Sequence, residues 1–213
     1  MVTSFKEQEF DIAVKEMECP DVSGWELFVE THGIKVFRYY RVQSKLYEYK
    51  VFGITNMDAD KCALVYMDIA YRKTWDSYVK ELTYLRKGDP EVIYWEVAYP
   101  WPMSNRDYVY LRQAKTMIKN EKNVYAILGR SAKPGELEER ETVDPKRGVI
   151  RVDDYLQSMV IADNGKGTSR IYMHYYDNPK GHIPAVVVNW AAKTGVASFL
   201  TTLEEACRSY RLE

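Results

Sequence analysis

Two aromatic-rich segments joined by a proline-containing loop constrain this chain more than any other feature. Residues 91–99 and 107–117 are typical of β-strands, and the connection carries an apolar Trp101 between Pro100 and Pro102. Aromatic side chains on both faces of such strands can cover a sheet and also line an enclosed space, because each ring offers apolar bulk and a π face. The pattern predicts a sheet that encloses a ligand.

The composition favours one soluble α+β domain. The chain has 213 residues, enough to bury a core with room for a cavity, and we find no internal repeat or linker that would divide it. Its 30 Lys and Arg residues nearly balance its 31 Asp and Glu residues, so the overall charge gives no reason to expect a nucleic-acid partner.

The cysteines and the first residues indicate a cellular compartment. Cys19, Cys62 and Cys207 are widely spaced and none lies at metal-ligand spacing from another ligand, which disfavours a disulfide framework and a metal site. The N-terminal residues lack an apolar signal core and a myristoylation glycine, and no Asn-x-Ser/Thr acceptor occurs. We expect a cytosolic protein.

Hydrophobic periodicity predicts a sheet that helices interrupt once. A first helix is expected over residues 5–18, and one or two short helices are expected over residues 58–76. About nine strands are expected, at residues 25–30, 34–41, 46–55, 78–85, 91–99, 107–117, 123–129, 149–162 and 169–176. Asn164-Gly165 predicts a tight hairpin between the last two strands, and the charged residues 133–147 predict a long solvated loop.

The segment from Ile183 to Leu203 is the second informative one, because Lys193 is its only charge. A membrane span needs about 20 apolar residues, but Lys193 and several polar residues near the middle make insertion costly. An apolar helical stripe favours instead a terminal helix that lies across the open sheet and closes the space inside it. Its N-terminal half could also touch a lipid surface.

Several runs in the chain resemble the START family of lipid-transfer domains. They are residues 66–68, 71–76, 94–113, 148–152 and 183–193, including Trp-Glu-Val-x-Tyr-Pro-x-Pro-Met-Ser-Asn-Arg-Asp-Tyr-Val-Tyr at residues 95–110. The resemblance covers essentially the whole chain and implies a single START domain over residues 1–213. It implies an α+β helix-grip fold, in which a curved antiparallel sheet of about nine strands surrounds a long C-terminal helix and an internal lipid tunnel.

The resemblance also implies a function and a set of site residues. The expected function is that of a cytosolic, non-catalytic carrier that extracts single phosphatidylcholine molecules and exchanges them between membranes. Arg72 would meet the lipid phosphate, with Asp76 holding the guanidinium. Trp95, Tyr108 and Tyr155 would form an aromatic cage for choline. Weaker candidates for the tunnel lining are Tyr66, Gln157 and His174.

A gate is also expected, because the lipid must enter from the side. Its candidate residues are apolar and lie in the proline loop and in the closing helix: Trp101, Met103, Val187 and Trp190. Membrane contact would be transient and peripheral. A monomer is expected because a carrier must detach from surfaces. No cofactor is expected apart from the bound phosphatidylcholine, and a protein partner is left open.

Alternatives remain for each of these features. From spacing alone, Arg72 and Asp76 are more typical of an exposed i,i+4 pair, and the three rings are more typical of sheet core. Trp101 could be a core residue folded under its loop, and His174 could be a hydrogen-bonded structural residue. A START domain that binds another phospholipid or a sterol, and that acts as a lipid sensor for a protein partner, is the second functional hypothesis. An enzyme is disfavoured, since no catalytic motif occurs.

Overall fold

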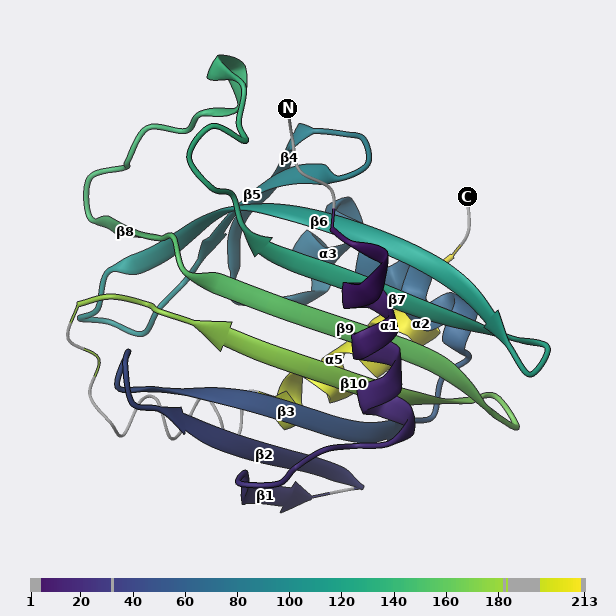
Figure 1. Ribbon diagram of the computed structural model, residues 1–213. Coiled ribbons are helices and arrows are strands. Elements are labelled where there is room, and N and C mark those ends of the chain that lie inside the picture. The colour runs from purple at the N-terminus through teal and green to yellow at the C-terminus, as the bar shows by residue number, and fades with distance from the viewer. Residues whose placement is uncertain (1–4, 32, 182, 184–195, 212–213) are drawn as a thin grey trace.

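The computed structural model describes residues 5–31, 33–181, 183 and 196–211. A curved, ten-stranded sheet forms the body, with helices on both of its faces (Figure 1). The described helices are α1 (Glu7–Glu18), α2 (Ala59–Met67), α3 (Ile69–Trp75) and α5 (Val196–Ser209), with a 3₁₀ turn η1 (Glu139–Glu141). The strands are β1 (Glu26–Thr31), β2 (Ile34–Arg41), β3 (Leu46–Thr55), β4 (Val79–Arg86), β5 (Glu91–Val97), β6 (Asn105–Lys119), β7 (Lys122–Ser131), β8 (Val149–Val152), β9 (Tyr155–Gly165) and β10 (Thr168–Asp177).

The strand order is β1-β2-β3-β10-β9-β7-β6-β5-β4, and every neighbour along this path pairs antiparallel. The tenth strand, β8, pairs in parallel with the start of β6, where Asn105 lies opposite Val149. It fills an edge that β7 leaves free, because β7 pairs with β6 only from Tyr110 onward. The prediction of one strand over residues 149–162 is therefore wrong, since the chain leaves the sheet at Asp153 and Asp154.

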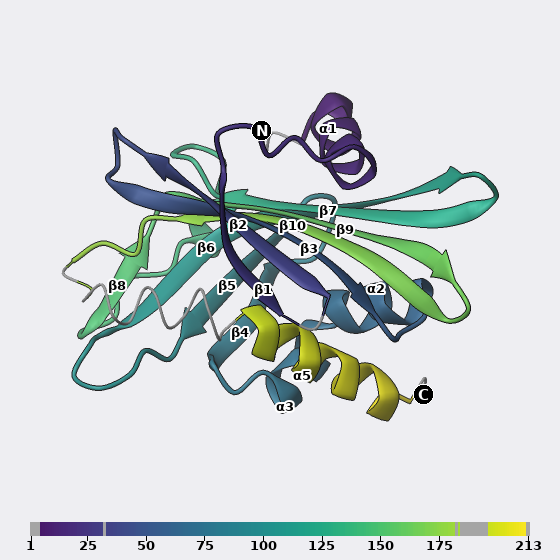
Figure 2. The same cartoon turned by 90° about the horizontal axis from the view of Figure 1, so that it is seen from below.

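The two faces of the sheet bury different helices. On the outer face, Phe10, Ala13, Val14 and Met17 of α1 pack at helical spacing against β7, β9 and β10. On the inner face, α2, α3 and α5 pack against the sheet and against one another (Figure 2). Because side chains alternate along a strand, each strand contributes one set of residues to each face.

The long connection between β7 and β8 is held down more firmly than its composition predicts. Glu136 forms a bidentate pair with Arg130, and the fully buried Glu141 accepts a hydrogen bond from Arg86 at 2.8 Å. Buried carboxylates need such partners, so the ion pairs fix the path of the loop. The prediction of a simply solvated loop is wrong at these two residues.

The predicted hairpin between β9 and β10 is confirmed, although its turn chemistry differs. Lys166 and Gly167 form the tip, with φ values of 55° and 71°, and Gly165 precedes them with a φ of 86°. The Asp163 carboxylate accepts a hydrogen bond from the Gly165 N–H at 2.6 Å. This turn is a local chain reversal and not a phosphate-binding loop.

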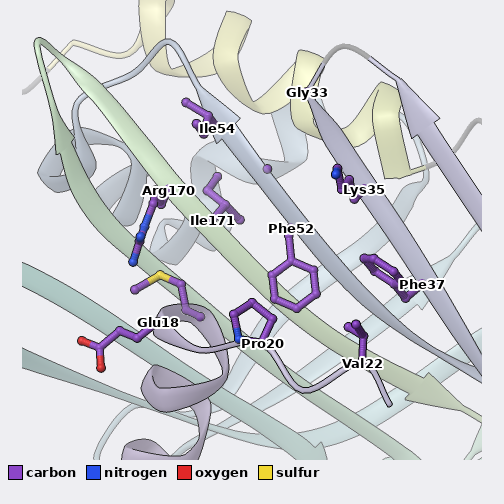
Figure 3. Close-up of a pocket in the computed structure, with 12 residues that line it drawn as sticks. Glu18, Pro20, Val22, Gly33, Lys35, Phe37, Phe52, Ile54, Arg170 and Ile171 are labelled. Carbon is purple, nitrogen blue, oxygen red and sulfur yellow. The ribbon is translucent and has the colours of Figure 1, made fainter. Parts of the chain in front are cut away.

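The outer face carries a hollow of about 400 Å³ beside the end of α1 (Figure 3). The residues that line it include the apolar Phe37, Phe52 and Ile171 and the charged Lys35 and Arg170. Because Ile171 also belongs to the inner cluster, the floor of the hollow is the sheet itself. The hollow opens on the side of α1, away from the inner helices. It is distinct from the predicted tunnel, which would lie on the inner face.

The predicted closing helix is described in part. Its described portion, α5, runs six residues beyond Leu203 to Ser209 and packs on α2 and α3. Residues 184–195, which include much of the predicted helix, lie outside the described residues. Within the described ranges, no helix is both long enough and apolar enough to cross a membrane.

Candidate functional site

Three rings proposed from sequence lie in series on the inner face of the sheet. Trp95 of β5 is the cross-strand neighbour of Tyr108 of β6, and their rings stack with centroids 5.0 Å apart. Tyr155 of β9 meets Tyr108 edge-on at 5.4 Å. Tyr110 and Tyr175 extend the cluster, each within 5.9 Å of Tyr155. The faces of such rings carry a negative potential that attracts a cation.

The charged pair proposed from sequence lies on α3, close to these rings. The helix begins at Asp68, whose carboxylate accepts a hydrogen bond from the Tyr71 N–H at 2.9 Å. Asp76 follows Arg72 by four positions, and the Arg72 Nε donates to the Asp76 carboxylate at 3.0 Å. Only 12% of the Arg72 side chain and 6% of the Asp76 side chain are exposed, so the alternative of an exposed surface pair does not hold.

Arg72 keeps its charge in this buried position. Burial opposes the charge, but Asp76 and the phenols of Tyr66 and Tyr110 outweigh it and raise the pKa of the guanidinium. The guanidinium carbon lies 5.1 Å from the Trp95 ring centroid and 5.6 Å from that of Phe199. Among the described residues, the Nη1 and Nη2 atoms of Arg72 form no hydrogen bond, so their donors are available to an anion.

Asp177, at the end of β10, is a site residue that the sequence reasoning missed. The Tyr108 hydroxyl donates to its carboxylate at 2.7 Å, and the Tyr175 hydroxyl also hydrogen-bonds to it. Burial raises the pKa of this carboxyl group, while the two phenols partly oppose the rise. The alternation of side chains along a strand could have identified Asp177, because it places Met173, Tyr175 and Asp177 on one face.

The weaker candidates divide between the two faces of the sheet. Tyr66 lies buried in the inner cluster on α2, and burial raises its pKa to about 12. Gln157 accepts a hydrogen bond from the Tyr155 hydroxyl at 2.6 Å, beside the rings. His174 lies on the outer face, where its Nε2 is 3.0 Å from Glu48 and its ring meets Trp25. The prediction that His174 lines the inner space is wrong, because its neighbours Met173 and Tyr175 occupy the inner positions of β10.

The gate candidates fall into two groups. Trp101 is 92% exposed at the tip of the β5–β6 connection, so it is not a core residue under the loop. Met103 in the same loop is partly buried, and its N–H donates to the Pro100 carbonyl at 3.0 Å. Val187 and Trp190 lie outside the described residues.

The arrangement is suited to binding and not to bond chemistry. It combines π faces with an Arg that has free donors, which together can receive a ligand carrying one positive and one negative group. The Trp95 indole N–H is also buried and has no hydrogen-bond acceptor in the described part of the chain. Across the same residues, no cluster of three or more His, Cys, Asp and Glu side chains could hold a metal.

The fold is a helix-grip fold, and the candidate site combines aromatic rings with a buried arginine on the inner face of its curved sheet. The family model for the START domain matches residues 6–213. The chain belongs to the START family.

The chain is also similar to curated proteins over nearly its whole length. It is 46% identical to the phosphatidylcholine transfer protein of Bos taurus over 211 residues, which cover 98% of this chain and 96% of that protein. It is 46% identical to the human phosphatidylcholine transfer protein over 210 residues, or 97% and 95% of the two chains. The mouse mitochondrial StAR-related lipid transfer protein 7 is 30% identical over 85% of this chain and 48% of its own.

Solved structures agree with the architecture. The crystal structure of human STARD10 superposes with a TM-score of 0.81 at 25% identity and covers 98% of this chain and 82% of that chain. Human StAR-related lipid transfer protein 5 gives a TM-score of 0.76 at 17% identity, over 94% and 95% of the two chains, which supports the fold alone. The predicted α+β helix-grip fold is confirmed, with ten strands in place of about nine.

Proposed function

We propose that this protein extracts single phosphatidylcholine molecules from membranes, carries them and exchanges them between membranes, without making or breaking a bond. The observation that carries the proposal is the series of Trp95, Tyr108 and Tyr155 on the inner face beside the buried pair of Arg72 and Asp76. The similarity to phosphatidylcholine transfer proteins over nearly the full chain supports it.

The head-group chemistry explains why these side chains suit choline. A trimethylammonium group donates no strong hydrogen bond, so aromatic faces stabilise it best in a dry site, by up to about 2 kcal/mol for each ring. The neighbouring phosphate can accept two parallel hydrogen bonds from the Nη atoms of Arg72. A primary ammonium would lose its hydrogen bonds to water and regain few, at a cost of roughly 1 to 3 kcal/mol. The site should therefore discriminate against phosphatidylethanolamine.

The acyl chains require that the protein shield the lipid from water, but they do not determine which lipid the protein selects. About thirty methylenes, at about 0.8 kcal/mol each, make removal of both chains into water cost roughly 24 kcal/mol. A tunnel between the sheet and the closing helix would offset this cost as a bilayer does. Since the bilayer shields the chains equally well, selectivity falls to the head-group residues.

The proline loop is our candidate for membrane contact, together with Val187 and Trp190 of the closing helix predicted from the sequence. An indole prefers the interfacial depth of a bilayer, and Trp101 is almost fully exposed. Arg106 links this loop to the segment after β10, because its guanidinium donates to the carbonyls of Ser104, Pro179 and Lys180. The loop and the chain that leads to the closing helix would thus move together.

We further propose that residues 1–213 act as one cytosolic, monomeric domain with a possible protein partner and no bound cofactor. The matched family region, residues 6–213, supports a single domain. The second functional hypothesis is a START-type sensor that binds another phospholipid or a sterol. The free Arg72 donors disfavour a sterol, which carries no anion for them.

Mass spectrometry of the lipids that co-purify with the protein tests the proposal most directly. We expect phosphatidylcholine in large excess over phosphatidylethanolamine and sterols. Transfer of labelled phosphatidylcholine between donor and acceptor vesicles should accompany it. If another lipid dominates, or if the protein transfers no phosphatidylcholine, this proposal is wrong and the sensor hypothesis takes its place.

A further inference from the structure

The contact between α2 and α5 contains two buried thiols that the proposed lipid site does not use. Cys62 of α2 is 1% exposed and Cys207 of α5 is 0% exposed, and neither forms a disulfide. Both belong to the cluster of apolar side chains between the inner face and these helices. Figure 2 shows α5 beside α2 and α3 beneath the sheet.

Hydrogen bonds at both ends of the contact place the two cysteines at the same level. The Asn56 N–H donates to the Glu204 carboxylate at 3.0 Å, and the Tyr210 hydroxyl donates to the Asp68 carboxylate at 3.0 Å. Cys62 lies midway between residues 56 and 68, and Cys207 lies midway between residues 204 and 210. The two helices therefore bring their central cysteines together.

The two thiols also interact directly. Interaction with the neighbouring Cys207 sulfur and burial raise the pKa of Cys62, and interaction with Cys62 lowers the pKa of Cys207. The third cysteine cannot take part, because Cys19 ends α1 on the opposite face of the sheet and is exposed. The chain thus holds one buried pair of neighbouring thiols and one isolated thiol.

We propose that Cys62 and Cys207 are an oxidisable dithiol whose disulfide fastens α5 to α2 and thereby slows lipid exchange. The first half of this proposal stands on the cysteine geometry, and the second half rests on the proposed lipid-transfer function. Phe199, on the same helix as Cys207, lies 5.6 Å from the guanidinium of Arg72. Fastening α5 would hold this cover over the head-group site.

The chemistry requires a peroxide as the oxidant. The Cys207 thiolate attacks one peroxide oxygen, the O–O bond breaks, and the departing hydroxide leaves as water after taking a proton. The resulting sulfenic acid is attacked by the Cys62 sulfur, its S–O bond breaks, and a second water leaves. Two thiols and one hydrogen peroxide give one disulfide and two waters, so the thiols lose two electrons and the peroxide gains them.

Peptide mapping of the full chain tests the thiol half. The protein is treated with hydrogen peroxide, the remaining thiols are alkylated, and the tryptic peptides are analysed by mass spectrometry. We expect a cross-linked peptide that contains Cys62 and Cys207, with Cys19 alkylated, and its loss after reduction with dithiothreitol. Separate alkylation of Cys62 and Cys207 after oxidation would overturn the proposal.

Transfer kinetics test the regulatory half. Oxidation should slow phosphatidylcholine transfer at least about tenfold, as expected when opening of a cover limits the rate, and dithiothreitol should restore it. Cys207→Ala and Cys62→Ala should each remove this response, and Cys19→Ala is the matched control that should keep it. A mapped disulfide with unchanged transfer would overturn the regulatory half. If the reduced protein transfers no phosphatidylcholine, the proposed function fails, whereas the mapping still decides the disulfide.

Discussion

Replacing Arg72 and Asp76 singly and together separates their part in folding from their part in lipid binding. In Arg72→Met, the Asp76 carboxylate stays buried and, within the described part of the chain, keeps only the hydrogen bond from the Tyr78 N–H, at 3.1 Å. Leaving one member of a buried ion pair uncompensated costs about 3 to 5 kcal/mol. We therefore expect a clear fall in the urea midpoint of this variant.

The double variant Arg72→Met with Asp76→Asn removes both charges. The new amide oxygen can still accept the hydrogen bond of the Tyr78 N–H, so the free energy of unfolding should return to within about 1 kcal/mol of the wild type. Head-group binding should not return, because two charge-assisted hydrogen bonds to phosphate are missing. At about 1.5 kcal/mol each, their loss weakens binding more than about a hundredfold.

Asp76→Asn alone is the matched control, because it keeps the guanidinium that the phosphate would meet. Added phosphatidylcholine should raise its urea midpoint, and should leave that of Arg72→Met nearly unchanged. The assays are urea unfolding followed by tryptophan fluorescence and transfer of labelled phosphatidylcholine between vesicles. Wild-type transfer by the double variant would refute the role assigned to Arg72, and an unshifted midpoint in Arg72→Met would refute the cost of the unpaired carboxylate.

Three further changes test other parts of the molecule. Asp177→Asn removes a buried charge, so stability at neutral pH should not fall. The preference for phosphatidylcholine over phosphatidylethanolamine should drop severalfold in the transfer assay. An unchanged preference would exclude Asp177 from the site. Trp101→Ser should leave the unfolding free energy within about 0.5 kcal/mol and reduce vesicle co-flotation, and equal flotation would contradict membrane contact by the loop. Burial opposes ionisation of Glu48, but hydrogen bonds from His174 and Arg41 lower its pKa from 4.5 to about 2. The folded state therefore gains stability from this carboxylate above about pH 4.5 and loses that gain as the pH falls toward about 2. Glu48→Gln should make the urea midpoint depend less steeply on pH in this acid range, without changing transfer. An equally steep pH dependence in the variant would contradict this role of Glu48.

Local periodicity and sequence motifs predict most of the fold and of the candidate site. The apolar spacing of Phe10, Ala13, Val14 and Met17 identifies the buried face of α1, because a packed helix must repeat its apolar residues each turn. The motif around Trp95 and Tyr108 identifies two of the rings, and the strand register places them together.

The features that sequence does not predict depend on contacts between distant segments. His174 was assigned to the wrong face because a shift of one residue exchanges the two faces of a strand. The parallel pairing of β8 depends on where β7 ends, and the burial of Glu141 depends on Arg86, 55 residues away. Asp177 joins the candidate site partly through the Tyr108 hydroxyl, 69 residues away.

Arg106 connects the proposed head-group site to the proposed gate, although no carboxylate hydrogen-bonds to its guanidinium among the described residues. It is 2% exposed, its guanidinium lies 4.4 Å from the Tyr99 ring centroid, and its three carbonyl contacts join the two chain segments that flank the gate. Because the hydrogen bonds of this guanidinium among the described residues all go to backbone carbonyls, they fix main-chain positions, and exchange of side chains in those segments would not disturb them. Two residues along β6 from Arg106, Tyr108 contributes its ring to the proposed choline cage. If the Trp101 loop contacts a bilayer as proposed, its displacement would be transmitted through β6 to a ring of the proposed choline cage.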